Sequence, residues 1–209
     1  MAKKIILDLC GGTGSWNKPY KEAGYDVRLI TLPDNDVREY KPPKNVYGIL
    51  AAPPCTMFSL ARTKAKKPRD LAEGMECVRA CLNIIWVCME IKQDTKHKIL
   101  PLKFWALENP NGMLKYFLGK PAFEFDPYEF GDGYKKRTNI WGWFNEPNKT
   151  GGKITCDRAY KSLNPNTMKK FDRLASREIA PEMFGKLTRQ ERRAITPAGF
   201  AKAFFKANK

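Results

Sequence analysis

Short apolar runs and amphipathic segments alternate along the start of the chain. Residues 4–9 are mostly apolar and predict a buried strand, which leads into a segment with three glycines. Residues 18–23 predict a short helix that stops at Gly24, and residues 26–30 predict a second strand. A strand, a glycine-rich turn, a helix and a second strand are typical of the opening of a doubly wound α/β domain.

The alternation continues through the rest of the chain. Further runs predict strands at residues 46–52, 104–107 and 138–144. Other segments predict helices at residues 71–91, 182–193 and 197–207. The segment 145–167 is rich in Asn, Lys, Gly and Pro and predicts a loop or small excursion. The whole pattern predicts one α/β domain spanning residues 1–209.

Ligands of open α/β sheets bind beyond the carboxyl ends of the strands. The candidate site therefore lies in the segments that end or follow predicted strands, which are 8–14, 31–36, 53–59 and 108–111.

The charge of the chain indicates a polyanionic partner. The 209 residues are 43% hydrophobic, which is enough for the core of a single domain, and 38 Lys and Arg face 22 Asp and Glu for a net charge of +16. Such an excess favours nucleic acid as the partner.

A membrane surface is the weaker alternative as a partner, because no predicted helix is strongly amphipathic with an exposed apolar face. No apolar run approaches the ~20 residues that span a bilayer, so we expect a cytoplasmic protein.

Cysteine and histidine usage narrows the chemistry. The six cysteines form no Cys-x-x-Cys pair, so we expect free thiols and no metal site. Cys77, Cys81 and Cys88 lie in an apolar helical segment and are expected in the core. The single histidine, His97, sits between lysines, which argues against Ser-His-Asp and Cys-His catalysis.

Three motifs at strand ends carry candidate chemistry. The segment 8–16 has glycines that let a ligand approach the backbone, but it lacks the spacing of a phosphate-binding loop. Two prolines stiffen the backbone before Cys55, whose thiol is a candidate nucleophile. Glu108 ends another strand, where burial would let it deliver a proton. Taken singly, each motif also fits a structural role: a tight turn, a buried thiol and a hydrogen-bonded carboxylate.

In this order the motifs resemble the cytosine-5 DNA methyltransferase family, and in particular its compact bacteriophage-type members. Two later segments extend the resemblance over nearly the whole chain: 131–142, which is similar to the arginine motif around Arg137, and 195–201, which is similar to the motif that returns to the cofactor pocket. The resemblance implies a Rossmann-like fold of the class I S-adenosylmethionine-dependent methyltransferases. It also implies Cys55 as nucleophile, Glu108 as acid and Arg137 as the group that holds the base or the catalytic loop.

The resemblance further implies S-adenosylmethionine as the cofactor, S-adenosylhomocysteine as its product, and no metal. It assigns the cofactor to the first motif, to the residues after the second strand and to the proline turn, namely Asp8, Leu9, Cys10, Gly11, Gly12, Thr13, Gly14, Ser15, Trp16, Thr31, Leu32, Asp36, Val37, Pro53 and Pro54. Thr31 and Leu32 stand where the family usually has an acid, for which Asp34 or Asp36 would compensate.

The implied partner is DNA, bound by a monomer in the cytoplasm of a bacterium or a phage-infected host, with a part in DNA methylation or restriction–modification. The expected contacts are polar and basic residues: Ser59, Arg62, Lys64, Lys66, Lys67, Arg69, Lys135, Lys136 and Asn139. A short basic insert at about 145–172 takes the place of a large target-recognition domain. Two alternatives stay open: the same chemistry on RNA or a pyrimidine nucleotide, and a lapsed relative that only binds nucleic acid.

Overall fold

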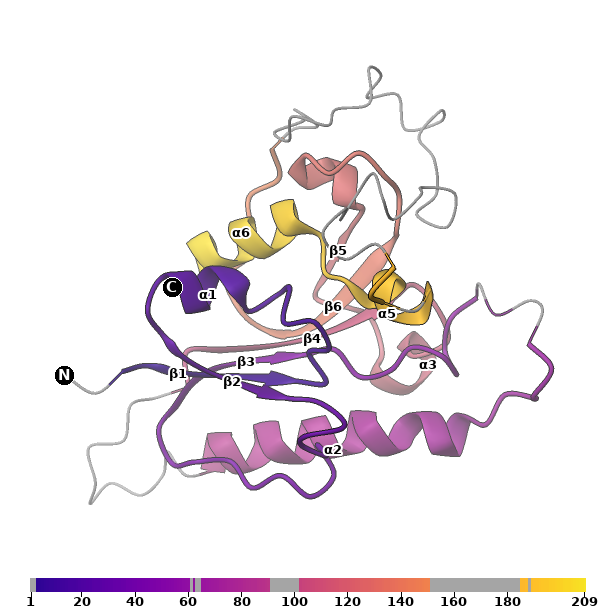
Figure 1. Cartoon of the computed structure of the whole chain (residues 1–209), viewed down its shortest axis with the longest axis horizontal. Helices are drawn as coiled ribbons and strands as arrows, with labels where there is room; N and C mark the ends of the chain where they lie inside the picture. The colour runs from indigo at the N-terminus through magenta and orange to yellow at the C-terminus, as the bar shows by residue number, and fades with distance from the viewer. Residues whose placement is uncertain (1–2, 61, 63–64, 91–101, 151–184, 188) are drawn as a thin grey trace.

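A six-stranded mixed sheet with helices on both faces forms the framework of the chain (Figure 1). The computed structural model describes residues 3–60, 62, 65–90, 102–150, 185–187 and 189–209. The strands are β1 (Ile5–Leu9), β2 (Asp26–Ile30), β3 (Val46–Ala51), β4 (Phe104–Pro110), β5 (Phe123–Phe125) and β6 (Thr138–Trp143). The helices are α1 (Lys18–Glu22), α2 (Leu71–Glu90), α3 (Lys115–Leu118), α5 (Arg189–Ala194) and α6 (Ala198–Ala207), with a 3-10 helix at Pro127–Phe130.

The strand order places the ends of four parallel strands at one edge. The order is β2-β1-β3-β4-β6-β5, in which β1 to β4 are parallel and β6 runs antiparallel to both of its neighbours. Pro110 at the end of β4 pairs with Thr138 at the start of β6. The residues just before β6 therefore lie beside the carboxyl ends of the parallel strands, where ligands of such sheets bind.

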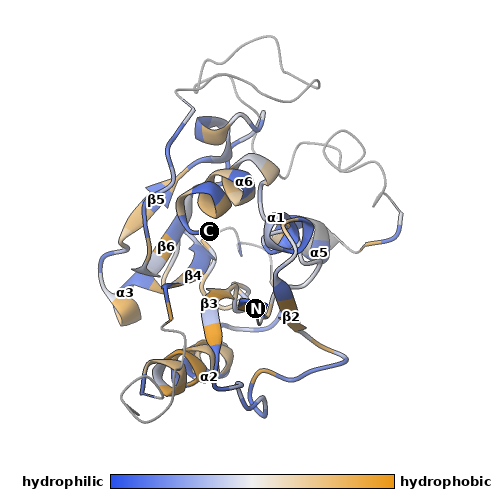
Figure 2. Cartoon of the chain, turned by 90° about the vertical axis from the view of Figure 1, so that its left-hand side faces the viewer, coloured by the Kyte–Doolittle hydropathy of each residue, from blue (hydrophilic) through white to orange (hydrophobic). Residues whose placement is uncertain are grey.

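Each face of the sheet buries its own hydrophobic cluster, so the predicted α/β class, with helices on both faces of one sheet, is confirmed. Leu7 and Leu9 of β1 point towards α2, whereas Ile6 faces α1 and α6. This alternation follows from the two-residue period of a strand. Figure 2 shows the layers end-on, with α2 on one side of the strands and α1 and α6 on the other. Among the described helices, none combines the length and apolar character needed to cross a membrane.

Most predicted helices and strands agree with the structure. The differences are elements whose length or existence depends on contacts with distant parts of the chain. The strands at 4–9, 26–30, 46–52 and 138–144 and the helices at 18–23, 71–91 and 197–207 are confirmed to within a residue or two at their described ends. Strand β4 is longer than predicted, since pairing with β6 extends it through residues 108–110. Strand β5 and helix α3 were not predicted.

Several predictions fall on residues outside the described part of the chain. These are Lys64, His97, residues 182–184 of the predicted helix 182–193, and most of the insert at 145–172, of which residues 145–150 are described. The predicted helix 182–193 is confirmed only as α5, because the described residues 185–187 form a turn that precedes it.

Candidate active site

The three strand-end motifs line one small cavity. It has a volume of about 70 Å³ and is bounded by the glycine turn around Gly11, by the Pro53–Cys55 turn and by Glu108. Lys136, which precedes β6, and Arg193 and Thr196 from the C-terminal part of the chain complete the wall. The structure thus gathers residues separated by almost the whole sequence at the carboxyl edge of the parallel strands.

A larger cleft of about 560 Å³ lies elsewhere, between α2 and residues 37–42. Of the predicted site residues it contains only Val37. We place the candidate active site in the smaller cavity, because that is where the thiol, the carboxyl and the glycine turn meet.

Asp8 lies fully buried at the floor of the glycine turn. Asn17 donates a 2.7 Å hydrogen bond from Nδ2 to Oδ2 of Asp8, and Oδ1 finds no partner among the described residues. Burial raises the pKa of Asp8 to about 7, although the Asn17 bond opposes this. A Cβ at Gly11 would collide with the Asp8 carboxyl group, so glycine is needed for the turn to close over it.

The glycine turn is built on left-handed backbone conformations. Cys10 has φ 57°, and Gly12 and Gly14 follow with φ 54° and 69°. Gly14 N–H donates to the Gly11 carbonyl at 2.9 Å, which closes the turn. The Cys10 thiol hydrogen-bonds with that of Cys81 on α2, and this bond lowers the pKa of Cys10.

Cys55 starts a tight turn at the end of β3. Its carbonyl accepts hydrogen bonds from the N–H groups of Phe58 (3.0 Å) and Ser59 (2.9 Å). Burial raises the pKa of the partly buried Cys55 thiol, and the negative charge of Glu108 adds to this effect. Lys136 and Arg193 act in the opposite direction, since a nearby cation favours the thiolate.

Glu108 reaches the cavity from within β4. Its neighbour Leu107 belongs to the core under α2, and the alternation of the strand turns Glu108 to the other face. Burial raises the pKa of Glu108, with Lys136 partly opposing. A raised pKa favours the protonated carboxyl group, which is the form that can donate a proton.

A second set of contacts holds the Cys55 turn in place. Asn109 Nδ2 donates to the Pro53 carbonyl at 3.0 Å. Arg69 donates from its two terminal nitrogens to the carbonyls of Met57 (2.7 Å) and Ser59 (2.8 Å). Gly112 forms a bridge with Ser59, and a Cβ at Gly112 would collide with the Phe58 carbonyl. The turn is therefore fixed from three directions.

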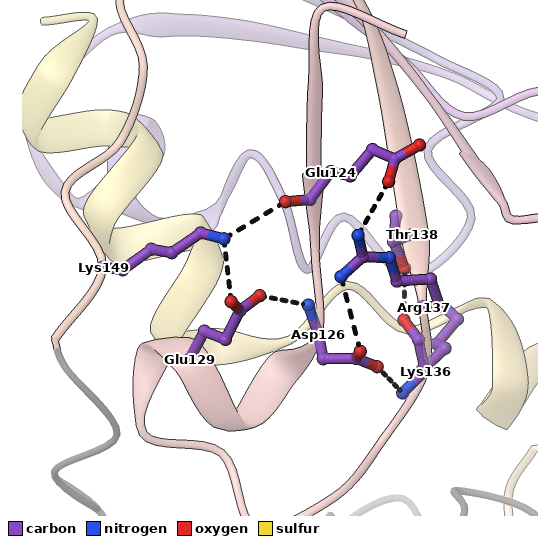
Figure 3. Close-up of polar contacts among 7 residues, drawn as sticks. All are labelled: Glu124, Asp126, Glu129, Lys136, Arg137, Thr138 and Lys149. Carbon is purple, nitrogen blue, oxygen red and sulfur yellow. Dashed lines mark hydrogen bonds and ion pairs between the residues drawn. The ribbon is translucent and has the colours of Figure 1, made fainter. Parts of the chain in front are cut away.

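Arg137 does not line the cavity. Its guanidinium donates to Glu124 on β5 at 2.7 Å and lies 3.7 Å from Asp126, as Figure 3 shows. Its neighbour Lys136 occupies the cavity wall, and the Lys136 N–H donates to Asp126 Oδ1 at 3.1 Å. Successive residues of an extended chain point to opposite sides, so only one of these two cations can face the site.

The remaining cofactor candidates lie at the same edge of the sheet or just beyond it. Thr31 follows β2, whose last carbonyl, at Ile30, accepts a 2.7 Å hydrogen bond from Cys10 N–H. Leu32 is exposed, and Val37 is buried. The Asp36 carboxylate is engaged by Arg38, and this bond lowers the pKa of Asp36 to about 2. A ligand that binds Asp36 would therefore meet a carboxylate whose charge is already paired with Arg38.

The predicted nucleic-acid contacts separate into surface and interior residues. Lys66 and Lys67 are exposed, although Lys67 pairs with Glu73 at 2.9 Å. Asn139 is fully buried, and neither polar atom of its side chain has a partner within the described parts of the chain. Arg69 faces the backbone of the Cys55 turn. Asn139 and Arg69 thus belong to the interior of the fold more than to its surface.

Trp16 connects the glycine turn to the C-terminal helix. Its ring packs against Phe200 and Phe204 of α6 at 5.8 and 5.4 Å between centroids, and its buried Nε1 lacks a partner among the residues that the structure describes. These contacts hold the segment containing Thr196 against the cavity. No group of three His, Cys, Asp or Glu side chains in the described ranges is placed to hold a metal ion.

Sequence reasoning missed Asn17, Arg193 and the cavity-facing role of Lys136, and it placed Asn109 in a candidate segment without giving it a role. Asn109 had a local signal, since it follows Glu108 directly. The others reach the site through tertiary contacts and carry no spacing that marks them.

Comparisons with known proteins do not assign this chain to a family. No protein-family profile and no curated protein matches the sequence. Among solved structures, the chain is similar to the Entamoeba histolytica methyltransferase EhMeth, with 12% sequence identity and a TM-score of 0.39. The match covers 74% of this chain and 58% of that chain, so the present chain spans less than two thirds of that protein. A TM-score this low supports no inference about activity.

Proposed function

We propose that this protein transfers a methyl group from S-adenosylmethionine to carbon 5 of cytosine in DNA, as a single class I methyltransferase domain. The observation that carries the proposal is that Cys55, in the turn after β3, and Glu108, on the adjacent strand β4, line one cavity with the glycine turn. A nucleophile and a proton donor on neighbouring strand ends can act on two positions of one ring.

The residues of the turn fit the methionine end of the cofactor. Asp8 Oδ1 is a buried acceptor and Trp16 Nε1 a buried donor, both without partners among the described residues and both in the cavity wall. An amino acid end offers an ammonium group to the first and a carboxylate to the second. The cavity of about 70 Å³ is far smaller than a pocket for a whole ligand of this size. The nucleoside end would therefore extend towards Thr31, Leu32 and Val37.

When bound, S-adenosylmethionine supplies an electrophilic methyl group. Cys55 thiolate forms a bond to carbon 6 of cytosine while Glu108 gives a proton to ring nitrogen 3, which makes carbon 5 nucleophilic. Transfer of the methyl group to carbon 5 would release S-adenosylhomocysteine. The carbon 5 proton would then pass to a water molecule, the bond between carbon 6 and sulfur would break to release the Cys55 thiolate, and ring nitrogen 3 would return its proton to Glu108. Burial raises the pKa of Glu108, which favours the protonated carboxyl group that this step requires.

The cations around the cavity support the nucleophile. Lys136 and Arg193 favour the thiolate of Cys55 against the effect of burial. We assign to Lys136 the contact with the reacting base, because it lines the cavity. We assign to Arg137 a structural role beside β6, because its guanidinium binds Glu124.

DNA is the substrate that suits the charge of the chain. The net charge of +16 favours a polymer of phosphates over a free nucleotide. The target carbon of cytosine is inaccessible inside a duplex, so the base must be flipped out or unpaired to reach the cavity.

The test is nucleoside mass spectrometry of DNA incubated with the protein and S-adenosylmethionine. We expect 5-methylcytosine with the unchanged chain and with Cys77→Ala, a control thiol on α2, and none with Cys55→Ala. Product from Cys55→Ala would contradict the covalent mechanism. Parallel reactions on RNA and on cytidine nucleotides would reveal a different substrate, and binding of DNA without any product would favour the binding-only alternative.

A further inference from the structure

Two segments free of acidic residues meet beside the Cys55 turn. Residues 55–69 hold five Lys or Arg and no Asp or Glu, and residues 111–121 hold two Lys and no Asp or Glu. The bridge between Ser59 and Gly112 joins them, and Met113 N–H donates to the Phe58 carbonyl at 2.9 Å. The structure thus brings the described parts of these two basic segments together at the edge of the candidate site.

Large apolar side chains are exposed on this surface. Tyr116 is 76% exposed, Leu60 60% and Phe117 47%. The Phe117 ring packs edge-on against Phe58 at 6.2 Å, which anchors it to the Cys55 turn. The ammonium group of Lys115 lies 5.6 Å from the centre of the Tyr116 ring. We call Leu60, Tyr116 and Phe117 the apolar patch.

The apolar patch and the Cys55 turn are on the same side of the molecule. In Figure 1, α3 lies near the N-terminal end of α2 and the chain that leads from β3 into it. If the target base of a nucleic acid enters the cavity, the nucleotides next to it would lie over α3.

We propose that the apolar patch binds unpaired bases of single-stranded DNA next to the target cytosine, an inference that rests on the proposed function. Aromatic rings exposed among cations are suited to this ligand, because every base has a face that can stack on a ring. Exposed lysines of the same segments, such as Lys66 and Lys115, bind the phosphates between those bases. In a duplex the faces of the bases are already stacked on each other, so the patch favours a single strand.

The position and charge of the patch select this ligand over a protein surface. Interfaces between proteins are depleted of Lys at their core, whereas Lys115 lies directly over Tyr116 here. The phosphate backbone is the acidic partner that the lysines of these acid-free segments, such as the exposed Lys66, would attract.

The experiment measures binding by fluorescence anisotropy with a labelled cytosine-containing 20-mer, offered as a single strand, as a duplex and as the equivalent RNA. All proteins carry Cys55→Ala so that no covalent adduct forms. Tyr116→Ala is compared with Trp143→Ala, a control ring that is 60% exposed at the far end of β6. Thermal unfolding followed by circular dichroism checks that both variants are folded.

We expect Tyr116→Ala to weaken binding of the single strand by about fivefold or more and binding of the duplex by less than about twofold. Trp143→Ala should change neither affinity. Equal losses on single strand and duplex, or no loss at all, would overturn the inference while leaving the proposed function intact. A loss confined to RNA would overturn the assignment to DNA. If the parent protein binds none of the three probes, the choice of a nucleic acid substrate fails as well.

Discussion

Asn109 Nδ2 donates a 3.0 Å hydrogen bond to the carbonyl oxygen of Pro53. Through this bond the strand that carries Glu108 is tied to the turn that presents Cys55. Asn109 is fully buried, so water cannot take the place of the donor. The spacing between the candidate acid and the candidate nucleophile therefore depends on a side chain that touches neither substrate nor cofactor.

Replacing Asn109 tests whether its hydrogen bond positions Cys55 and Glu108 for the reaction or only stabilises the fold. We expect Asn109→Ala to lower the free energy of unfolding by about 1–3 kcal/mol, because the buried Pro53 carbonyl loses its donor. The methylation rate should fall by about tenfold or more, since the two reacting groups lose their fixed spacing. Chemical denaturation and single-turnover kinetics measure the two effects, with Asn83→Ala on the exposed side of α2 as the control. An unchanged rate in a destabilised Asn109→Ala protein would show that the bond is only structural.

Arg69 offers a test that keeps the charge constant. Its two terminal nitrogens bind the carbonyls of Met57 and Ser59, a pairing that the single ammonium group of a lysine cannot reproduce. Arg69→Lys should slow methylation by about tenfold and leave DNA affinity and its salt dependence unchanged. Arg62→Lys is the matched control in the same segment. If Arg69→Lys instead weakens DNA binding and spares the rate, Arg69 contacts the phosphate backbone and does not hold the turn.

Lys136 is expected to control the reactivity of Cys55. Its charge favours the thiolate, so Lys136→Met should raise the pKa of Cys55 further. The rate of Cys55 alkylation by iodoacetamide at pH 8, followed by peptide mass spectrometry, should fall by about three- to tenfold. Lys135→Met and Arg137→Met should have much smaller effects, because neither side chain lines the cavity. A larger effect of Arg137→Met would mean that Arg137 leaves Glu124 and turns into the site.

Asp8 makes stability depend on pH in a defined direction. Its pKa rises from 3.8 to about 7 in the folded chain, so the folded state keeps a proton that the unfolded state loses between these values. The contribution of Asp8 to stability therefore falls as the pH rises from about 4 to about 7 and is constant above that.

Asp8→Asn should remove this dependence. The variant should gain stability relative to the parent as the pH rises through the same window, by up to about 4 kcal/mol at pH 8. Urea unfolding at a series of pH values measures the difference, with the exposed Asp34→Asn as the control. A difference between Asp8→Asn and the parent that does not vary with pH would contradict the assignment. In the proposed function, Asp8→Asn also weakens cofactor binding.

Local patterns predict most of the fold and half of the site. The strands that carry Asp8 and Cys55 could be recognised because their apolar runs are bounded by glycine and proline. Strand β5 has only three residues, Phe123–Phe125, and exists because β6 pairs with it. A segment of that length has no periodicity to detect.

The choice between Lys136 and Arg137 shows where sequence reasoning ends. Both cations precede β6, and the motif resemblance favours Arg137 as the group near the base. Which of them faces the cavity is decided by the alternation of the chain and by two acids that bind Arg137, Glu124 of β5 and Asp126 just after it. These acids are close in space only after the antiparallel pairs have formed.

The place of β6 between β4 and β5 also constrains how the chain is made. During synthesis, β4 is complete at Pro110, but its partner on that side ends at Trp143. A nascent chain of intermediate length therefore presents the open edge of a central strand, a surface prone to pairing with other chains. We infer that a chain truncated before Trp143 is prone to aggregate. In the full chain, β6 covers the open edge of β4 once it has been synthesised.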